Sequence, residues 1–218
     1  MGRVFTVARD FYDTGEILFT KKNITIEPGL TVLVGCNGSG KTTFLHIIEG
    51  ALKKKKIPVI SFDNLSSGGS RSISAAMFYG DINRVACGMT SSEGENISLN
   101  IGTIAGQVGA LVRKTQLANT ENKEIWLLLD AVDSGLSIDN IRELKEDFLQ
   151  LAIHDCEKSG IELYIVAAAN EYELAAGERC LDVSANRTMS FKNYDEYAEY
   201  VMQTRENKNQ RIKNAKKA

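Results

Sequence analysis

The chain has 218 residues, and its 26 basic and 28 acidic residues leave a formal charge of -2. Its composition, 43% hydrophobic and 25% charged, is that of a globular protein with a substantial core, and it excludes a disordered, collagenous or coiled-coil chain. No apolar run reaches the ~18–20 residues that a membrane span needs, and the N-terminus carries no apolar signal segment. We therefore expect a cytoplasmic protein without a membrane partner.

The pattern of apolar residues predicts strands that alternate with helices. Strands are expected at residues 4–7, 16–20, 22–27, 30–34, 57–62, 125–129 and 161–169, and helices at 42–52, 97–115, 139–158 and, in part, 73–89. Residues 125–129 form the clearest buried strand, and the helix at 139–158 carries its apolar side chains on one face. Alternating strands and helices imply an α/β fold with a largely parallel sheet.

The cysteines argue against a metal site. Cys36, Cys87, Cys156 and Cys180 are widely spaced and form no C-x-x-C pair, and only two histidines could join them as ligands. Structural zinc needs clustered ligands, so we expect none here. Without an export signal, reduced thiols are the expectation.

Two basic segments leave two interpretations open. Lys53 to Lys56 form a run of lysines, and residues 205–218 carry six basic residues and one acidic residue. Each segment is either a solvated surface or a contact to a nucleic-acid backbone, since lysines that neutralise phosphates give affinity without sequence preference. We predict a single domain over residues 1–204, followed by a basic C-terminal tail at 205–218.

Residues 35–42 form a complete phosphate-binding loop, G-x-x-x-x-G-K-[ST], between a predicted buried strand and a predicted helix. The loop consists of Gly35, Cys36, Asn37, Gly38, Ser39, Gly40, Lys41 and Thr42. Its glycines let backbone amides face phosphate oxygens, and the helix N-terminus adds a positive dipole end. Lys41 would contact the β- and γ-phosphates, and the Thr42 hydroxyl would bind Mg²⁺. The motif predicts a nucleoside triphosphate, ATP, as cofactor.

A carboxylate follows the predicted strand at 125–129. Asp130 stands at the carboxyl end of that strand. An acid at this place near a phosphate-binding loop can hold Mg²⁺ directly or through water. The sequence therefore predicts Asp130 as a metal ligand.

Three motifs together resemble the nucleotide-binding domain of ABC-type ATPases. The loop sequence from Asn37 to Thr43 (Asn-Gly-Ser-Gly-Lys-Thr-Thr) is typical of that superfamily, and residues 127–137 resemble its second motif and D-loop. Between them, Ser91 to Glu95 (Ser-Ser-Glu-Gly-Glu) resembles the signature sequence, in the form found in chromosome-maintenance and repair ATPases and in phage or restriction-linked relatives. The resemblance covers most of residues 16–175.

The resemblance implies a P-loop NTPase fold like an ABC ATPase head, with an N-terminal antiparallel β portion beside the parallel sheet. It also implies an ATP-dependent homodimer, in which Ser92 and Gly94 of one head contact the γ-phosphate held by the other. A plain helix cap completed by Glu95 is the alternative for this segment. Only about fifty residues separate the loop from the signature segment. This stretch is too short to contain long coiled-coil arms. A small, armless, phage-like member of the repair branch is implied, with nucleic acid or a protein as partner.

Further site residues follow from the same resemblance. Asp63, or else Asn64, takes the place of the polar residue that senses magnesium after the second core strand. Tyr12 or Phe11 would stack on adenine, or would simply pack in the protein.

The sequence departs from the family at two positions. Ala131 stands where the family has the glutamate that polarises the attacking water, and Asn170 stands where it has a switch histidine. A methyl group accepts no proton, and Asn carries no titrating proton. Both losses predict slow hydrolysis or none. Asp133 is a possible substitute base, and Glu93 of an opposing signature is a weaker one.

Three functions therefore compete. The first is an ABC-type ATPase that dimerises with ATP, and the second is a nucleotide-gated binding module without turnover. The third is a P-loop kinase for a small molecule, which would need an arginine-rich lid. The arginines of the chain are scattered, as Arg71, Arg84 and Arg113 are, and they form no such cluster, so the kinase is disfavoured.

Overall fold

The computed structural model describes residues 2–7, 18–64, 93–117 and 123–215. Its strands are β1 (Arg3–Thr6), β2 (Asn23–Ile26), β3 (Gly29–Leu33), β4 (Val59–Asp63), β5 (Glu124–Asp130), β6 (Glu162–Ala168), β7 (Arg179–Asp182) and β8 (Arg187–Met189). Its helices are α1 (Lys41–Lys54), α5 (Glu93–Leu117), α6 (Ile138–Glu143), the π-helix η1 (Leu144–Gln150), α7 (Leu151–Lys158), α8 (Tyr172–Ala175) and α9 (Tyr194–Ala215).

A six-stranded sheet forms the centre of the molecule, in the order β4-β5-β6-β3-β7-β8. All neighbouring strands are parallel except β7 and β8, which pair antiparallel. β1 and β2 form a separate antiparallel sheet. The predicted α/β class, with a largely parallel sheet and an N-terminal antiparallel portion, is confirmed. This arrangement is compatible with a P-loop NTPase.

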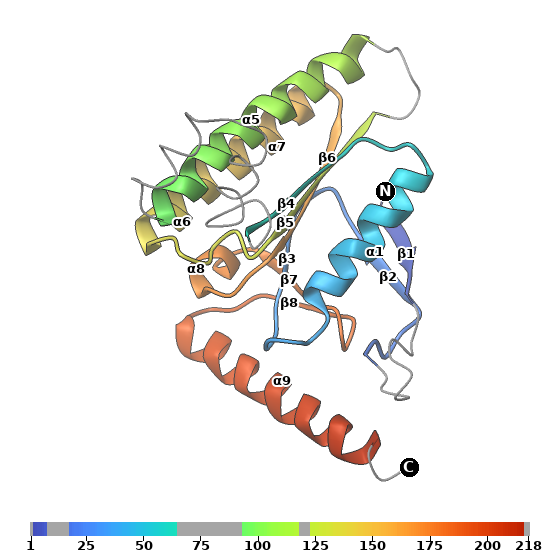
Figure 1. Cartoon of the computed structure of the whole chain (residues 1–218), viewed down its shortest axis with the longest axis vertical. Helices are drawn as coiled ribbons and strands as arrows, with labels where there is room; N and C mark the ends of the chain where they lie inside the picture. Colours follow the sequence, from blue (N-terminus) through green and yellow to red (C-terminus); the bar gives the residue numbers. More distant parts are fainter. Residues whose placement is uncertain (1, 8–17, 65–92, 118–122, 216–218) are drawn as a thin grey trace, which may run out of the picture.

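The central sheet is covered on both faces (Figure 1). α1 and the β1–β2 sheet lie on one face, and α5, α6 and α7 lie on the other. Successive side chains of a strand point to opposite faces. On β5, Ile125 and Leu127 accordingly join the core under α5, whereas Trp126 and Leu128 join the core under α1. The uninterrupted apolar run of β5 is thus explained by burial on both faces.

Most predicted elements are present, with small shifts of their ends. The strand expected at 16–20 is wrong for its described part, because residues 18–20 form no strand. The helix expected at 139–158 is present as α6, η1 and α7 in succession, and η1 closes π-type turns. The helix expected within 73–89 lies outside the described residues. β7, β8 and α9 were not predicted, and α9 continues past residue 205 to Ala215.

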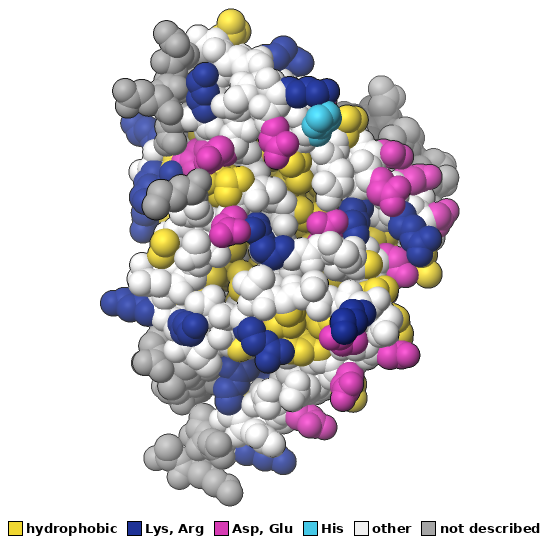
Figure 2. All heavy atoms as spheres, turned by 180° about the vertical axis from the view of Figure 1, so that it is seen from behind, with side chains coloured by type: hydrophobic (Ala, Val, Ile, Leu, Met, Phe, Trp, Pro, Cys, Tyr) yellow, Lys and Arg dark blue, Asp and Glu magenta, His cyan; other side chains and the backbone are white. Residues whose placement is uncertain are grey.

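Viewed from behind, basic and acidic side chains are interspersed over the surface (Figure 2). In the four described segments, no helix combines the length and the apolar character that crossing a bilayer requires.

Parallel pairing brings the carboxyl ends of four strands to one edge of the sheet. β3 ends at Leu33, just before the glycine-rich loop, and β6 ends at Ala168. In the register of the sheet, Asp63 pairs with Asp130, and Asp130 pairs with Ala168. Residues that are about thirty to a hundred positions apart in sequence therefore meet beside the loop.

Candidate nucleotide-binding site

The glycine-rich loop connects β3 to α1 and uses left-handed backbone conformations. Gly38 has φ 74° and Gly40 has φ 100°, values that side chains with a Cβ rarely adopt. A methyl group at Gly40 would also lie 3.2 Å from the Leu18 side chain. Gly40 is the N-cap of α1 and supplies no capping side chain. The first amides of α1 therefore remain available for an anion.

Lys41 is folded back over this loop. Its side chain is only 8% exposed, and Nζ donates to the carbonyl oxygens of Gly35 at 2.7 Å and of Cys36 at 3.4 Å. Burial lowers the pKa of Lys41, against the opposing effect of nearby acidic groups that include Asp133 and Asp130. The ammonium is thus held at the loop by the protein itself.

A cavity of about 270 Å³ collects most of the predicted site residues. Its walls are formed by Asn37, Gly38, Gly40, Lys41, Thr42, Thr43, Asp63, Asp130, Ala131, Ala168 and Asn170. These residues come from the loop, α1 and the ends of β4, β5 and β6. The cavity therefore joins the phosphate-binding loop to the two strand-end aspartates and to Asn170.

The donor set at this cavity fits a magnesium ion. The Thr42 hydroxyl hydrogen-bonds the Asp130 carboxylate. Burial raises the pKa of Asp130, and the neighbouring Asp63 raises it further. Two carboxylates and a hydroxyl side by side are the hard oxygen ligands that Mg²⁺ prefers, and a cation would offset the repulsion between the carboxylates.

Asp63, rather than Asn64, faces the cavity. Asn64 is not among the wall residues, and its Nδ2 donates to the Ser134 carbonyl at 2.9 Å. Of the two predicted candidates, only Asp63 lines the cavity beside Asp130.

Ala131 lies in the cavity wall in a strained conformation. Its φ is 51°, and its carbonyl accepts a hydrogen bond from the Ser134 amide at 3.1 Å. A left-handed residue with a Cβ costs roughly 1–2 kcal/mol. The turn after β5 holds this strain at the position where the sequence lacks the expected glutamate.

Asp133 is completely buried and serves as a hydrogen-bond acceptor. Its Oδ2 accepts from the amides of Asn170 at 2.6 Å and of Glu171 at 2.8 Å. Burial raises the pKa of Asp133, and these two amides oppose the rise. Asp133 does not line the cavity. This geometry favours a role in joining the turn after β5 to the end of β6 over a role as a base.

Asn170 is held from two sides. Its Nδ2 donates to the Ser134 Oγ at 2.8 Å, and its carbonyl accepts from the Tyr197 hydroxyl at 3.2 Å. Its orientation is therefore coupled to the turn after β5 and to α9.

The sequence analysis missed the contribution of α9 to this site. The Thr204 Oγ1 accepts from the Cys36 amide at 2.9 Å, and the Lys208 Nζ donates to the Asn37 carbonyl at 3.0 Å. Three residues further along, Arg211 donates to the Leu18 carbonyl at 3.4 Å. Positions 204, 208 and 211 share one face of a helix. The spacing of four and three residues is the sequence signal that indicates a helix with these side chains on one face.

Ser92, Tyr12 and Phe11 lie outside the described residues. In the described part of the chain, the helix expected at 97–115 is present as α5, which includes Gly94. The contacts of the signature segment stay predictions.

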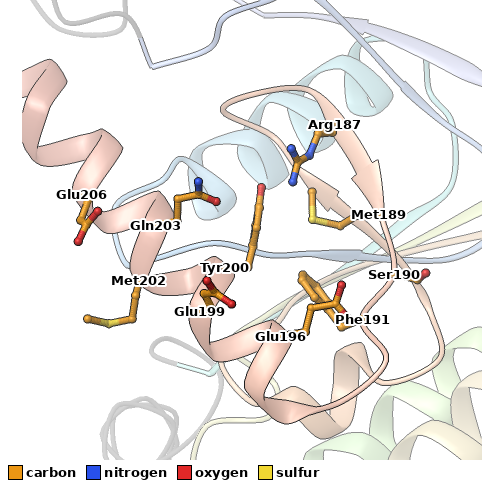
Figure 3. Close-up of a pocket in the computed structure, with 10 residues that line it drawn as sticks. All are labelled: Arg187, Met189, Ser190, Phe191, Glu196, Glu199, Tyr200, Met202, Gln203 and Glu206. Carbon is orange, nitrogen blue, oxygen red and sulfur yellow. The ribbon is translucent and has the colours of Figure 1, made fainter.

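A second cavity, of about 480 Å³, lies between β8 and α9 (Figure 3). β8 contributes Arg187 and Met189, and α9 contributes Glu196, Glu199 and Glu206 among other residues. Its walls carry three glutamates and one arginine.

Two curated relatives match short stretches of the chain. An ABC transporter ATP-binding protein of Pyrococcus abyssi is 42% identical over 50 residues, which cover 23% of this chain and 19% of that protein. A cytochrome c biogenesis ATP-binding export protein of Reclinomonas americana is 38% identical over 69 residues, which cover 31% of this chain and 30% of that protein. No family model matches the chain. The matches span less than a third of either relative, and they support an ABC-type nucleotide-binding domain.

The buried carboxylate of Asp133 yields a prediction for stability. Asp133→Ala removes the acceptor of two backbone amides, so we expect the free energy of unfolding to fall by about 2 kcal/mol. Urea denaturation measures this change. Asp155→Ala, at an exposed position on α7, is the control and should change stability by less than about 0.5 kcal/mol. Equal effects of the two substitutions would contradict the role assigned to Asp133.

Proposed function

We propose that this chain is an ABC-type ATP-binding domain whose glycine-rich loop binds Mg-ATP. The convergence of the loop with Asp63, Asp130 and Asn170 in one cavity carries this proposal. The local matches to two ABC ATP-binding proteins also support it.

Each group at the cavity has a role in this proposal. Lys41 and the backbone amides of residues 35–43 hold the phosphates, and Asn170 lies beside the γ-phosphate. Thr42, Asp130 and Asp63 hold Mg²⁺ directly or through water. When bound, the ion neutralises charge on the β- and γ-phosphate oxygens. The buried, low-dielectric position of Lys41 strengthens its attraction to phosphate.

Hydrolysis is slow in this proposal. Ala131 offers no acceptor for a proton from the attacking water, and the Asp133 carboxylate already accepts two backbone amides. The same observations favour a second candidate function, a nucleotide-gated binding module without turnover. The two functions differ in steady-state phosphate release.

The finer assignment rests on the signature segment. We include in the proposal an ATP-dependent homodimer in which Ser92 and Gly94 of one copy contact the γ-phosphate bound by the other. The sequence Ser-Ser-Glu-Gly-Glu at residues 91–95 favours the chromosome-maintenance and DNA-repair-like branch, and so does the small number of residues between the loop and this segment. In this proposal the chain is a small, phage-like member of that branch and is located in the cytoplasm. Its partner would be nucleic acid or a protein.

Lys41→Ala tests the binding site. Loss of a buried ammonium that contacts two phosphates should weaken Mg-ATP binding by about 100-fold, which a calorimetric titration measures. The control is Lys54→Ala, at an exposed position on the same helix, which should bind like the wild type. Unchanged affinity in the Lys41 variant would refute the site.

Ala131→Glu tests the cause of slow hydrolysis. A carboxylate at this position would orient water, so phosphate release should rise by roughly 10²–10⁴-fold. Ala131→Gln has the same length without a base and should stay at the wild-type rate. If Ala131→Glu binds Mg-ATP but hydrolyses no faster, the missing glutamate does not explain the low turnover.

Light scattering tests the dimer. The wild type should double its molar mass with Mg-ATP and stay monomeric with Mg-ADP. Ser92→Arg should bind Mg-ATP and remain monomeric, because the larger charged side chain blocks the contact to the γ-phosphate of the other copy. A Ser92→Arg variant that still dimerises with ATP would refute the assignment of the signature.

A further inference from the structure

A third cavity, of about 680 Å³, lies between the glycine-rich loop and α9. The loop, the turn after β5 and α9 contribute to its walls, which include Asn37, Asn170, Arg205, Lys208 and Asn209. Among these wall residues are two cations and three asparagines, but no aspartate or glutamate. A cavity with cationic and amide donors and without carboxylates attracts an anion.

The ammonium of Lys208 lies at the tip of the loop. Its Nζ is 3.0 Å from the Asn37 carbonyl oxygen, and a methyl group added to Gly38 would clash with that Nζ. The side chain is half-buried, while Arg205, one turn earlier on α9, is exposed. Lys41 approaches the same loop from α1, so cations from two helices meet at the loop.

This cavity adjoins the one that contains the magnesium ligands. Asn37 and Asn170 line both cavities. The carboxylates of Asp63 and Asp130 lie on one side of this boundary, and the cations of α9 lie on the other. Since the proposed function sets the γ-phosphate beside Asn170, that phosphate would stand between the metal and the α9 cations.

The charges of α9 are divided between its two faces. The side toward β8 contributes Glu196, Glu199 and Glu206 to the cavity of Figure 3, whereas the side toward the loop contributes Arg205 and Lys208. Figure 1 shows α9 lying below the connection from β3 to α1.

We propose that Arg205 and Lys208 bind the terminal phosphate of ATP within the same chain, so that α9 makes the site prefer ATP to ADP. The inference rests on the proposed function, because it takes the glycine-rich loop as the ATP site. It adds a source of discrimination that needs no second copy of the protein. α9 is then part of the nucleotide site instead of an appended basic tail.

The test compares Mg-ATP and Mg-ADP affinities of the full-length chain by calorimetric titration. Arg205→Ala and Lys208→Ala should each weaken Mg-ATP binding about tenfold and leave Mg-ADP binding within twofold of the wild type. Lys208→Arg keeps the charge and should restore most of the preference. Lys213→Ala, an exposed position further along α9, is the control and should change neither affinity.

The possible outcomes separate this inference from the proposed function. If Lys208→Ala lowers the affinities for Mg-ATP and Mg-ADP by the same factor, Lys208 only supports the loop. If Arg205→Ala also leaves the ratio of the two affinities unchanged, the inference is overturned. Arg205 is exposed, so its variant reports on phosphate binding even if Lys208→Ala impairs folding. If the wild type binds both nucleotides and Lys41→Ala binds neither, the proposed function survives that result. A wild type that binds neither nucleotide overturns both.

Discussion

The parallel pairing of β3, β4, β5 and β6 is the constraint on which the candidate site depends. It sets the ends of these strands at one edge of the sheet, where Asp63 and Asp130 are paired in register and the glycine-rich loop follows β3. A slip of one residue would turn each side chain to the opposite face. Such a slip would exchange the β5 side chains between two cores that are packed around different residues, and this loss of packing opposes it. The core thus fixes the positions of the polar groups at the edge.

Much of this arrangement could be predicted from the sequence, because it follows from local patterns. The glycine-rich loop, the strand that precedes it and the helix that follows it are adjacent in the chain, and Asp130 directly follows the most apolar strand. The role of α9 could not be predicted in this way, since Thr204 and Lys208 meet Cys36 and Asn37 across about 170 residues. For the same reason, the two amides bound by Asp133 were missed, and its burial turns a candidate base into a structural acceptor. Propensity carries no information about such pairings.

In the proposed function, the charges around the loop would hold phosphate rather than activate water. Carboxylates that suit a metal ion lie on one side, Lys41 lies over the loop, and the cations of α9 lie on the far side. Ala131 occupies the wall in a strained left-handed turn and contributes only a methyl group. Tight binding and slow chemistry are compatible, because binding depends on interactions present in the ground state, whereas turnover needs a group that acts in the transition state. Such a balance suits a protein that signals the presence of ATP through its conformation or assembly.

Amide hydrogen exchange of the full-length chain, with and without Mg-ATP, tests the central claim most directly, because it locates the bound nucleotide without any substitution. If the glycine-rich loop binds the nucleotide, amide exchange slows with Mg-ATP in residues 35–43, in the turn at 130–134 and in the part of α9 that contacts the loop. Slower exchange confined to the β8–α9 cavity, with residues 35–43 unchanged, would contradict the glycine-rich loop as the nucleotide site.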